Sequence, residues 1–240
     1  MQPLYGQRAR FYDAIYRFKD YAAEAQRVRS ILAGLGVRER GRLLDAGCGT
    51  ASHLVELAKW YEVSGFDLSP SMIDFAKAKL PTAELFVADM VDFEVKDPVD
   101  AVVCQFGGIG YVFPKERLIS TARAFADAVK PGGALIVEPW LTEELFVEGR
   151  ITMQTYDTEG LKICRSVVAK KDGAFSTFRF HWLAAEAGAE DVEYFIDDHR
   201  LWLCPHETLL GAFDRAGFDV RFDPDGLMPD RGLVVGTRRG

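Results

Sequence analysis

RLLDAGCGTASHL, residues 42–54, joins a short apolar run to an acid, two glycines and the beginning of a helical pattern. The apolar run is typical of a buried strand, and the residues after the glycines have the spacing of a helix. Gly47 and Gly49 let the backbone approach a ligand closely, which a Cβ would block. The stretch therefore predicts a ligand-binding loop between a strand and a helix.

Further pairs of strand and helix follow over the first two thirds of the chain. Ser69 and Pro70 mark one helix start, because serine caps a helix N-terminus and proline loses no hydrogen bond at the first position. The strand-like segments are 42–47, 63–69, 101–106 and 134–139, and the helical segments are 52–61, 70–80 and 115–129, the last of which leads into the turn KPGG. Apolar strands that alternate with helices predict an α/β fold with a Rossmann-like, doubly wound, mostly parallel sheet.

The pattern changes from about residue 150. In TFRFHWL, residues 177–183, aromatic side chains fall on one strand face and polar side chains on the other. DDHRLWLC, residues 197–204, alternates similarly. We therefore expect residues 150–204 to form an antiparallel β insertion in a single domain, 1–240. Its two-faced strands leave one face to cover the active-site mouth, a second subunit, or both.

Composition limits the classes of function. The 240 residues are 48% hydrophobic, enough to bury a full core. The formal net charge of −7 and the absence of a clustered basic run argue against a nucleic-acid partner and against an anionic membrane surface. The N-terminal residues lack the apolar segment of a secretion signal, and no apolar run is long enough to span a membrane. We expect a cytoplasmic protein.

Cysteine usage predicts neither a disulfide framework nor a zinc site. The four cysteines stand far apart in the sequence without a CxxC pair. Cys48, within the glycine loop, has the character of a small apolar residue rather than of a nucleophile. We find no cluster of metal ligands and expect no metal ion.

Acidic side chains follow three consecutive predicted strands. Asp45 ends the first strand, and Asp67 ends the second about 20 residues after the glycines, where an acid accepts hydrogen bonds from ribose hydroxyls. A further strand, ELFVAD at residues 84–89, ends in Asp89 and is followed by Met90, and these two side chains suit the exocyclic amine and the face of a purine. Because parallel strands end at one edge of a sheet, these groups predict a nucleoside site.

The ligand depends on the details of the loop. A nicotinamide dinucleotide fold needs a third glycine to dock its pyrophosphate, and residues 50–52 are Thr-Ala-Ser. The sequence Asp45-x-Gly47-x-Gly49 instead resembles motif I of class I S-adenosylmethionine-dependent methyltransferases, and residues 42–138 as a whole resemble that family. The residues to which this resemblance assigns cofactor contacts are Tyr12, Tyr21, Asp45, Ala46, Gly47, Gly49, Asp67, Leu68, Met72, Asp89, Met90 and Gln105.

A narrower resemblance spans almost the whole chain. The segments that carry it are YGQRARFYDAIYRFKDYAAEA, FGGIGYV, VEPW, FHW and DRGLVVG. They are similar to the N-methyltransferases of nucleotide-linked amino sugars, which add one or two methyl groups to a TDP-amino sugar in deoxysugar biosynthesis. Members of that family carry a histidine where this chain has Tyr111. The resemblance implies a homodimer and an N-terminal helical lid, 1–40, that covers the cofactor.

Methylation of an amine requires a neutral nitrogen aimed at the sulfonium methyl, and positioning alone supplies much of the rate. The proton can pass to water, a tyrosine or a carboxylate. The catalytic candidates are Tyr12, Tyr111 and Glu138. Tyr12 and Tyr16 could instead pack as one helix face. Tyr111 follows a glycine-rich turn, and Glu138 ends an apolar strand, where a buried acid needs a partner.

The phosphates of a nucleotide-sugar need cations. Arg165, Arg179 and Arg231 are the candidates, since a guanidinium binds phosphate through two hydrogen bonds. Arg231 is preferred, because DRGLVVG carries the family resemblance. His181 either contacts the substrate or is a hydrogen-bonded core histidine, of which we favour the second. Trp140 either stacks on a sugar or base or packs in the core.

Three kinds of function remain open on the sequence alone. The first is N-methylation of a nucleotide-linked amino sugar with S-adenosylmethionine as cofactor. The second is methylation of another small-molecule amine or hydroxyl. The third is cofactor binding without catalysis, or a dehydrogenase with an unusual loop.

Overall fold

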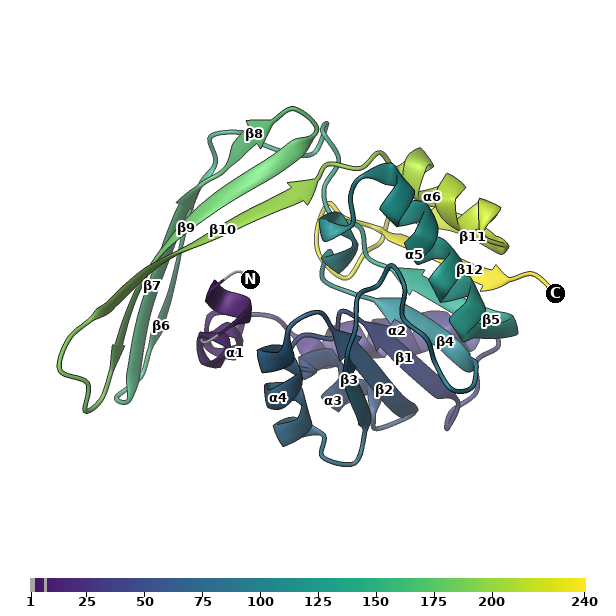
Figure 1. Cartoon of the computed structure of the whole chain (residues 1–240), viewed down its shortest axis with the longest axis horizontal. Coiled ribbons are helices and arrows are strands. Elements are labelled where there is room, and N and C mark those ends of the chain that lie inside the picture. Colours follow the sequence, from purple (N-terminus) through teal and green to yellow (C-terminus); the bar gives the residue numbers. More distant parts are fainter. Residues whose placement is uncertain (1–2, 7) are drawn as a thin grey trace.

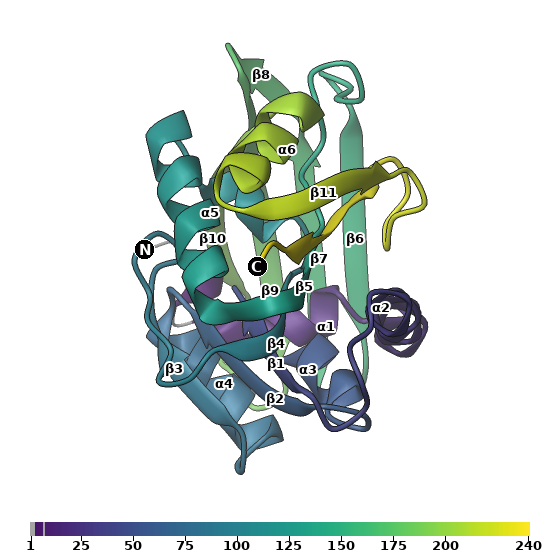
Figure 2. The same cartoon turned by 90° about the vertical axis from the view of Figure 1, so that its right-hand side faces the viewer.

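The computed structural model describes residues 3–6 and 8–240 and has two layers with α1 (Tyr12–Ile15) of the N-terminal segment between them (Figure 1). One layer is a seven-stranded sheet covered by helices, and the other is a five-stranded antiparallel sheet. Figure 2 looks through the first layer onto the second sheet behind it. Of the predicted lid, residues 1, 2 and 7 lie outside the described residues.

The first sheet has the strand order β11-β12-β5-β4-β1-β2-β3. Its strands are β1 (Arg42–Ala46), β2 (Glu62–Asp67), β3 (Glu84–Val87), β4 (Val99–Cys104), β5 (Val129–Val137), β11 (Phe218–Asp223) and β12 (Leu233–Arg238). The first five strands are parallel, and β12 runs antiparallel to both of its neighbours. Strand order reverses between β1 and β4, which is where a doubly wound sheet opens its ligand crevice. The predicted fold class is confirmed.

Helices cover both faces of the first sheet. They are α2 (Tyr21–Gly34), α3 (Ser52–Leu57), α4 (Pro70–Lys79), α5 (Lys115–Ala128) and α6 (His206–Arg215). Leu44 lies in the core cluster under α5 and α6, whereas Leu43 lies in the cluster under α2, α3 and α4. Successive strand residues thus enter different cores, which explains why these strands are apolar throughout. None of the described helices is both long and apolar enough to cross a lipid bilayer.

The predicted helix start at Ser69 is confirmed. The Met72 amide donates to Ser69 Oγ over 3.2 Å, and Pro70 occupies the first turn. Asp20 caps α2 in the same way, accepting from the Ala23 amide over 2.9 Å. These caps fix where α4 and α2 begin on the ligand side of the sheet.

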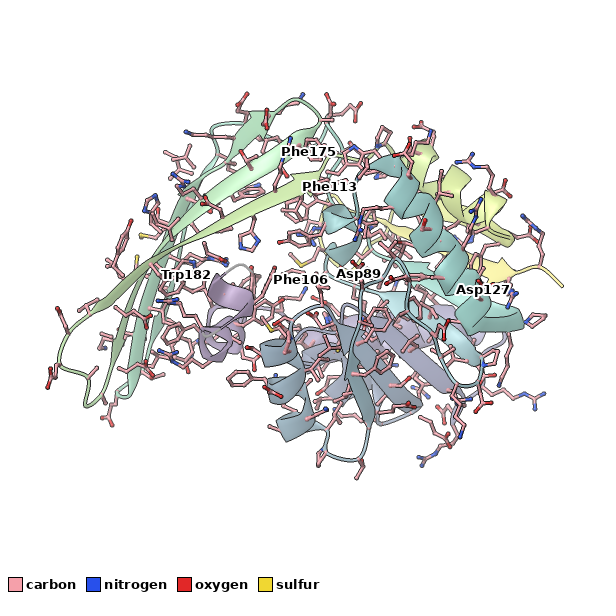
Figure 3. All side chains as sticks on the ribbon, viewed as in Figure 1. Asp89, Phe106, Phe113, Asp127, Phe175 and Trp182 are labelled. Carbon is pink, nitrogen blue, oxygen red and sulfur yellow. The ribbon has the colours of Figure 1, made fainter. Side chains whose placement is uncertain are left out.

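The second sheet forms the predicted β insertion. Its strands are β6 (Ile151–Asp157), β7 (Leu161–Val168), β8 (Lys170–Asp172), β9 (Phe175–Glu186) and β10 (Glu193–Trp202), in the order β10-β9-β7-β6 with β8 beside β9. Trp182 is fully buried on the inner face against Phe11 and Ile15 of the N-terminal segment. Figure 3 shows Trp182 at this position, and Phe113 and Phe175 where the sheet joins the first layer. The opposite, outer face is open to solvent.

Two predicted boundaries are wrong. The KPGG segment belongs to β5: Val129 pairs with Val99, and the ladder resumes only at Ala134 and Ala101, so the residues between them form an irregularity inside the strand. The predicted helix 52–61 ends at Leu57. The Trp60 amide donates to the Leu57 carbonyl over 3.0 Å, which tightens the last turn and stops the helix.

Candidate active site

The glycine loop after β1 has the close backbone approach that its sequence predicts. Gly47 and Gly49 have φ angles of +80° and +55°, where a side chain is disfavoured. A Cβ on Gly47 would lie 2.5 Å from Met90 Cε, a clash. The amides of Gly47 and Cys48 both donate to the Phe66 carbonyl, at 2.8 and 2.9 Å, which anchors the loop to β2. Met90 therefore lies directly against the loop, as the strand-end argument requires.

Two carboxylates flank this loop, of which Asp45 is buried and Asp67 is part-buried. Asp67 at the end of β2 accepts from the amides of Gly49 and Ser69, both at 2.9 Å. Asp45 is 2% exposed, and its Oδ1 has no hydrogen-bond partner in the described part of the chain. Burial, with repulsion from Asp67, raises the pKa of Asp45 to about 7. A neighbouring cation or hydrogen-bond donor would stabilise the ionised form.

Further polar atoms at the strand ends lack partners. Both side-chain polar atoms of Gln105 are buried without a hydrogen bond of good geometry to a described residue, although the amide is near enough to Asp45 to oppose the rise of the Asp45 pKa. Buried polar groups in proteins are nearly always satisfied, so Asp45 and Gln105 together indicate a ligand with donors and acceptors of its own. Asp89 is different: its carboxylate pairs with Arg117 over 2.7 Å and accepts from the Val91 amide over 3.1 Å.

The other predicted cofactor residues surround the loop at varied depth. Ala46 and Met72 are buried, whereas Leu68 is 67% exposed. Tyr21 lies at the start of α2, with its ring edge-on to His53 at 4.8 Å between centroids. The structure therefore brings Ala46 to the floor of the site and Leu68 to its rim.

The N-terminal segment lies across the strand ends and contacts both layers. Toward the first layer, Asp13 accepts from Thr50 over 2.5 Å and pairs with Lys79 over 2.6 Å. The Ser69 hydroxyl donates to the Tyr5 carbonyl. Toward the second sheet, Arg8 pairs with the Glu193 carboxylate over 2.6 Å. The segment thus closes over the glycine loop and is attached on two sides.

Tyrosine rings line the inside of this closure. Tyr12 contacts Tyr16 at 4.7 Å and Tyr5 at 6.1 Å between ring centroids. Tyr12 and Tyr16 pack against each other, as expected if they form one helix face. The two rings also face the site. Burial raises the pKa of Tyr12 well above its usual value, and the nearby Asp67 carboxylate adds to this rise. A neutral phenol is therefore held beside the glycine loop.

Tyr111 is the first member of a hydrogen-bonded series that reaches into the second sheet. Its hydroxyl lies 3.1 Å from the Tyr5 hydroxyl and 2.5 Å from His199 Nδ1. His199 Nε2 lies 2.5 Å from Asp197 Oδ2. His199 and Asp197 are functional candidates that sequence reasoning missed, although the alternation in DDHRLWLC places both on one strand face.

Glu138, at the end of β5, has the partners that its burial predicts. It is fully buried and accepts from the Phe106 amide over 2.5 Å and from the Met228 amide over 3.1 Å. Burial raises the pKa of Glu138, while Arg231 opposes this rise. Phe106 has a φ of +58°, so Glu138 holds a backbone conformation that is strained for phenylalanine.

Two cationic side chains, Arg231 and Lys19, lie against the ring of Phe106. Figure 3 labels Phe106 on the side of the first layer that faces the second sheet. The Arg231 guanidinium lies 4.4 Å from the Trp140 ring and 5.3 Å from the Phe106 ring. Lys19 Nζ lies 4.0 Å from the centroid of the Phe106 ring and is paired with Glu24 over 2.8 Å. Arg231 is 8% exposed, and its Nη1 has no hydrogen-bond partner among the described residues.

The remaining substrate candidates divide between the two faces of the second sheet. Arg165 is on the inner face, 5% exposed, and donates to the Tyr16 hydroxyl over 3.0 Å. Arg179 and His181 lie on the exposed outer face, where they contact Asp198 and Tyr194. The structure does not bring Arg179 or His181 to the site, and the expectation of a core histidine at position 181 is wrong. The reason is the strand register, which pairs Arg165 with Trp182 and so turns odd-numbered β9 residues outward.

The described residues contain no group of three or more His, Cys, Asp or Glu side chains that could hold a metal ion. The four cysteines are free.

Comparison with known proteins agrees with this geometry. A family model described as a methyltransferase domain matches residues 43–133. Together with the sheet order and the glycine loop, this defines a class I S-adenosylmethionine-dependent methyltransferase. The dTDP-3-amino-3,4,6-trideoxy-alpha-D-glucopyranose N,N-dimethyltransferase of Streptomyces venezuelae is 33% identical over 94% of this chain and 95% of its own length.

Solved structures of similar proteins narrow the class. The sugar N-methyltransferase KedS8 from Streptoalloteichus sp ATCC 53650 superposes with a TM-score of 0.88 at 36% identity, covering 95% of this chain and 93% of that one. The S-adenosylmethionine-bound amino pentose methyltransferase CalS10 from Micromonospora echinaspora has a TM-score of 0.85 at 30% identity, covering 95% and 96%. The chain belongs to the sugar N-methyltransferase family.

Proposed function

We propose that this enzyme transfers methyl groups from S-adenosylmethionine to the amino nitrogen of a TDP-linked amino deoxysugar, in the biosynthesis of deoxysugars such as those of antibiotics. Arg231 carries the substrate part of the proposal. It is a buried guanidinium with an unpartnered Nη1, beside the indole ring of Trp140 and close to Gly107, which follows β4. Glu138 interacts electrostatically with this guanidinium, and the unpartnered Nη1 can donate to a further anion, such as the phosphates of a nucleotide diphosphate.

The residues at the strand ends fit the cofactor. The glycine loop admits the backbone approach, Asp67 retains oxygen lone pairs for ribose hydroxyls, and Met90 offers an apolar contact to a purine. The unpartnered Asp45 and Gln105 atoms match a ligand that carries an ammonium and a carboxylate. S-adenosylmethionine, when bound, supplies an electrophilic methyl group next to this loop.

We assign positioning and proton handling to the tyrosines of the site. Tyr12 is a neutral phenol near Asp67. Tyr5 lies between Tyr12 and Tyr111: its ring contacts the Tyr12 ring, and its hydroxyl bonds to the Tyr111 hydroxyl. Both can orient an amine through hydrogen bonds, which favours a productive approach to the methyl group. Glu138 stays a catalytic candidate, and its two backbone hydrogen bonds support a role in fixing the loop at Phe106.

We infer that the N-terminal segment acts as a lid over the bound cofactor. Its attachments are an ion pair between Asp13 and Lys79, an ion pair between Arg8 and Glu193 and the hydrogen bond to Ser69. Partly exposed ion pairs of this kind contribute little each, so the contacts to the first layer can break at modest cost, whereas Phe11 and Ile15 stay buried against Trp182 of the second sheet. The free cysteines support the cytoplasm as the place of the reaction.

We also propose a homodimer through the outer face of the second sheet. Strand register puts exposed apolar side chains on this one face: Ile151, Met153, Val168, Leu183 and Tyr194. The ion pair of Arg179 with Asp198 lies on the same face and offers both charges to a symmetry-related copy. Leu183→Glu is expected to give a monomer in sedimentation velocity, and Leu145→Glu, outside this face, to leave the dimer intact.

The proposed function is tested by offering three amines to the enzyme with S-adenosylmethionine: a TDP-amino sugar, the same sugar without the nucleotide, and an unrelated amine. Methylated TDP-amino sugar is the expected main product. Equal turnover of the free amine would remove the nucleotide-sugar assignment and favour the alternative of another small-molecule acceptor.

A further inference from the structure

His199 and Asp197 form a buried pair that the proposed function does not yet use. Both belong to β10, two residues apart on its inner face, and are 7% and 0% exposed. The pair is bonded at both ends: the Leu4 amide donates to Asp197 Oδ1 over 3.2 Å, and Tyr111 meets His199 Nδ1 over 2.5 Å. The second sheet therefore supplies a histidine and a carboxylate to a site built mainly by the first sheet.

The hydrogen bonds permit one consistent direction. Asp197 Oδ2 accepts from His199 Nε2–H, so His199 Nδ1 is left as an acceptor. The Tyr111 hydroxyl donates to Nδ1, and its oxygen accepts from the Tyr5 hydroxyl. Every proton in the series thus points from the crevice toward Asp197. This is the arrangement of a histidine held in one tautomer by a buried carboxylate.

Packing keeps His199 in this orientation. Its ring lies edge-on to Tyr5 and to Phe180, with 5.4 Å between centroids in each case. The titratable groups near His199 are Asp197 and Asp198 on its own strand, of which Asp198 lies on the outer face, Tyr111 from the first layer and Tyr5 from the N-terminal segment. Of these groups, the Asp197 carboxylate is the one that stabilises a positive imidazole through its hydrogen bond.

The series leads to the cofactor loop. Tyr5 contacts Tyr12, which lies near Asp67. Gly108 begins the helical turn that carries Tyr111, and a Cβ added to Gly108 would lie 3.5 Å from Met90 Cε. The helical turn that carries Tyr111 thus contacts Met90 beside the glycine loop, and His199 lies one hydrogen bond behind Tyr111.

We propose that His199, positioned by Asp197, accepts through Tyr111 the proton that the substrate ammonium must lose before each methylation. This rests on the proposed function. The substrate N–H proton passes to Tyr111 Oη while the Tyr111 hydroxyl proton passes to His199 Nδ1, which leaves a neutral amine, an intact tyrosine and an imidazolium paired with Asp197. The amine lone pair then forms the N–C bond as the C–S bond breaks and its electron pair stays on sulfur. The imidazolium returns its proton to solvent.

The test compares kcat as a function of pH for wild type, His199→Asn and Asp197→Asn with a TDP-amino sugar. Both variants are expected to lose about 10- to 100-fold in kcat at pH 7. This loss is at or below the lower end of the roughly 100- to 10,000-fold contribution of general acid–base catalysis. The deficit is expected to shrink toward pH 9, because more of the amine is then already neutral. A purely structural loss would be independent of pH. His206→Asn, which removes a part-buried histidine of α6 that stacks on Phe222, is the matched control and is expected to keep the wild-type profile.

A double variant tests that His199 acts through Tyr111. Tyr111→Phe breaks the series without altering either strand of the second sheet, so it remains informative if His199→Asn unfolds. Adding His199→Asn to Tyr111→Phe is expected to cost little more than Tyr111→Phe alone, because the two groups act in one series. Additive losses, or a His199→Asn profile parallel to the wild-type profile at all pH values, would overturn the relay. The proposed function fails separately, if no methylated TDP-amino sugar forms with wild-type enzyme.

Discussion

Replacing Arg231 by alanine removes one group from the crevice while leaving the cofactor loop intact. Its guanidinium lies against Trp140 and Phe106, and no hydrogen bond to a described residue satisfies Nη1. The glycine loop is held by Asp67 and by the Phe66 carbonyl, neither of which depends on Arg231. We therefore expect the substitution to weaken binding of the nucleotide-sugar and to leave the affinity for S-adenosylmethionine nearly unchanged.

The magnitude follows from the contact that is lost. A hydrogen bond to a charged group stabilises a complex by about 1.5–3 kcal/mol, which corresponds to roughly 10- to 150-fold in affinity. Because a diphosphate far from the reacting nitrogen is bound equally in the ground and transition states, the loss is expected in KM rather than in kcat. Arg231→Lys keeps the positive charge that lowers the pKa of Glu138. We therefore expect it to raise KM less than Arg231→Ala does.

Steady-state kinetics with a TDP-amino sugar, together with calorimetric titration of S-adenosylhomocysteine, separates the two affinities. Thermal unfolding serves as the control, since removing a partner of the buried Glu138 carries a stability cost of its own. An unchanged KM in folded Arg231→Ala, or a parallel loss of cofactor affinity, would refute the assignment of Arg231 to the phosphates.

Three further outcomes are expected. Gly47→Ala should abolish cofactor binding in a thermal-shift assay, because its Cβ would clash with Met90, whereas Gly36→Ala, also at positive φ but in open space, should keep it. Since burial raises the pKa of Asp45 to about 7, the ligand-free folded protein binds more protons than the unfolded chain between about pH 4 and pH 7, and its free energy of unfolding should fall as pH rises through that range. Calorimetry of Asp45→Asn should show a smaller fall; an identical slope would contradict the burial argument. Turnover should survive excess EDTA, because an amine nucleophile needs no metal to activate it; loss of turnover would favour the O-methylation alternative.

The first sheet and its cofactor loop could be predicted because their signals are local. Asp45, Gly47 and Gly49 lie within five positions of one another, and a strand, a loop and a helix start are enough to orient them. Asp67 follows from the same rule, since parallel strands end at one edge. Of the two boundaries that were wrong, that of β5 depends on pairing with the distant strand β4, whereas the end of α3 is set locally by the turn at Leu57.

Residues of the second sheet could not be assigned to a face in the same way. Alternation shows that Arg179 differs in orientation from Trp182, but which face is inward depends on packing against the N-terminal segment, where Phe11 meets Trp182. His199 was missed for this reason: its partners Tyr111 and Tyr5 are 88 and about 190 positions away, and no local pattern records their meeting.

The central claim is tested most directly by mass spectrometry of a TDP-amino sugar incubated with the enzyme and S-adenosylmethionine. The expected product has gained the mass of one or two CH₂ groups on the amino nitrogen, with one S-adenosylhomocysteine released per methyl. Unchanged TDP-amino sugar in the presence of folded, cofactor-binding enzyme, or methylation of the free amine at an equal rate, would contradict the claim.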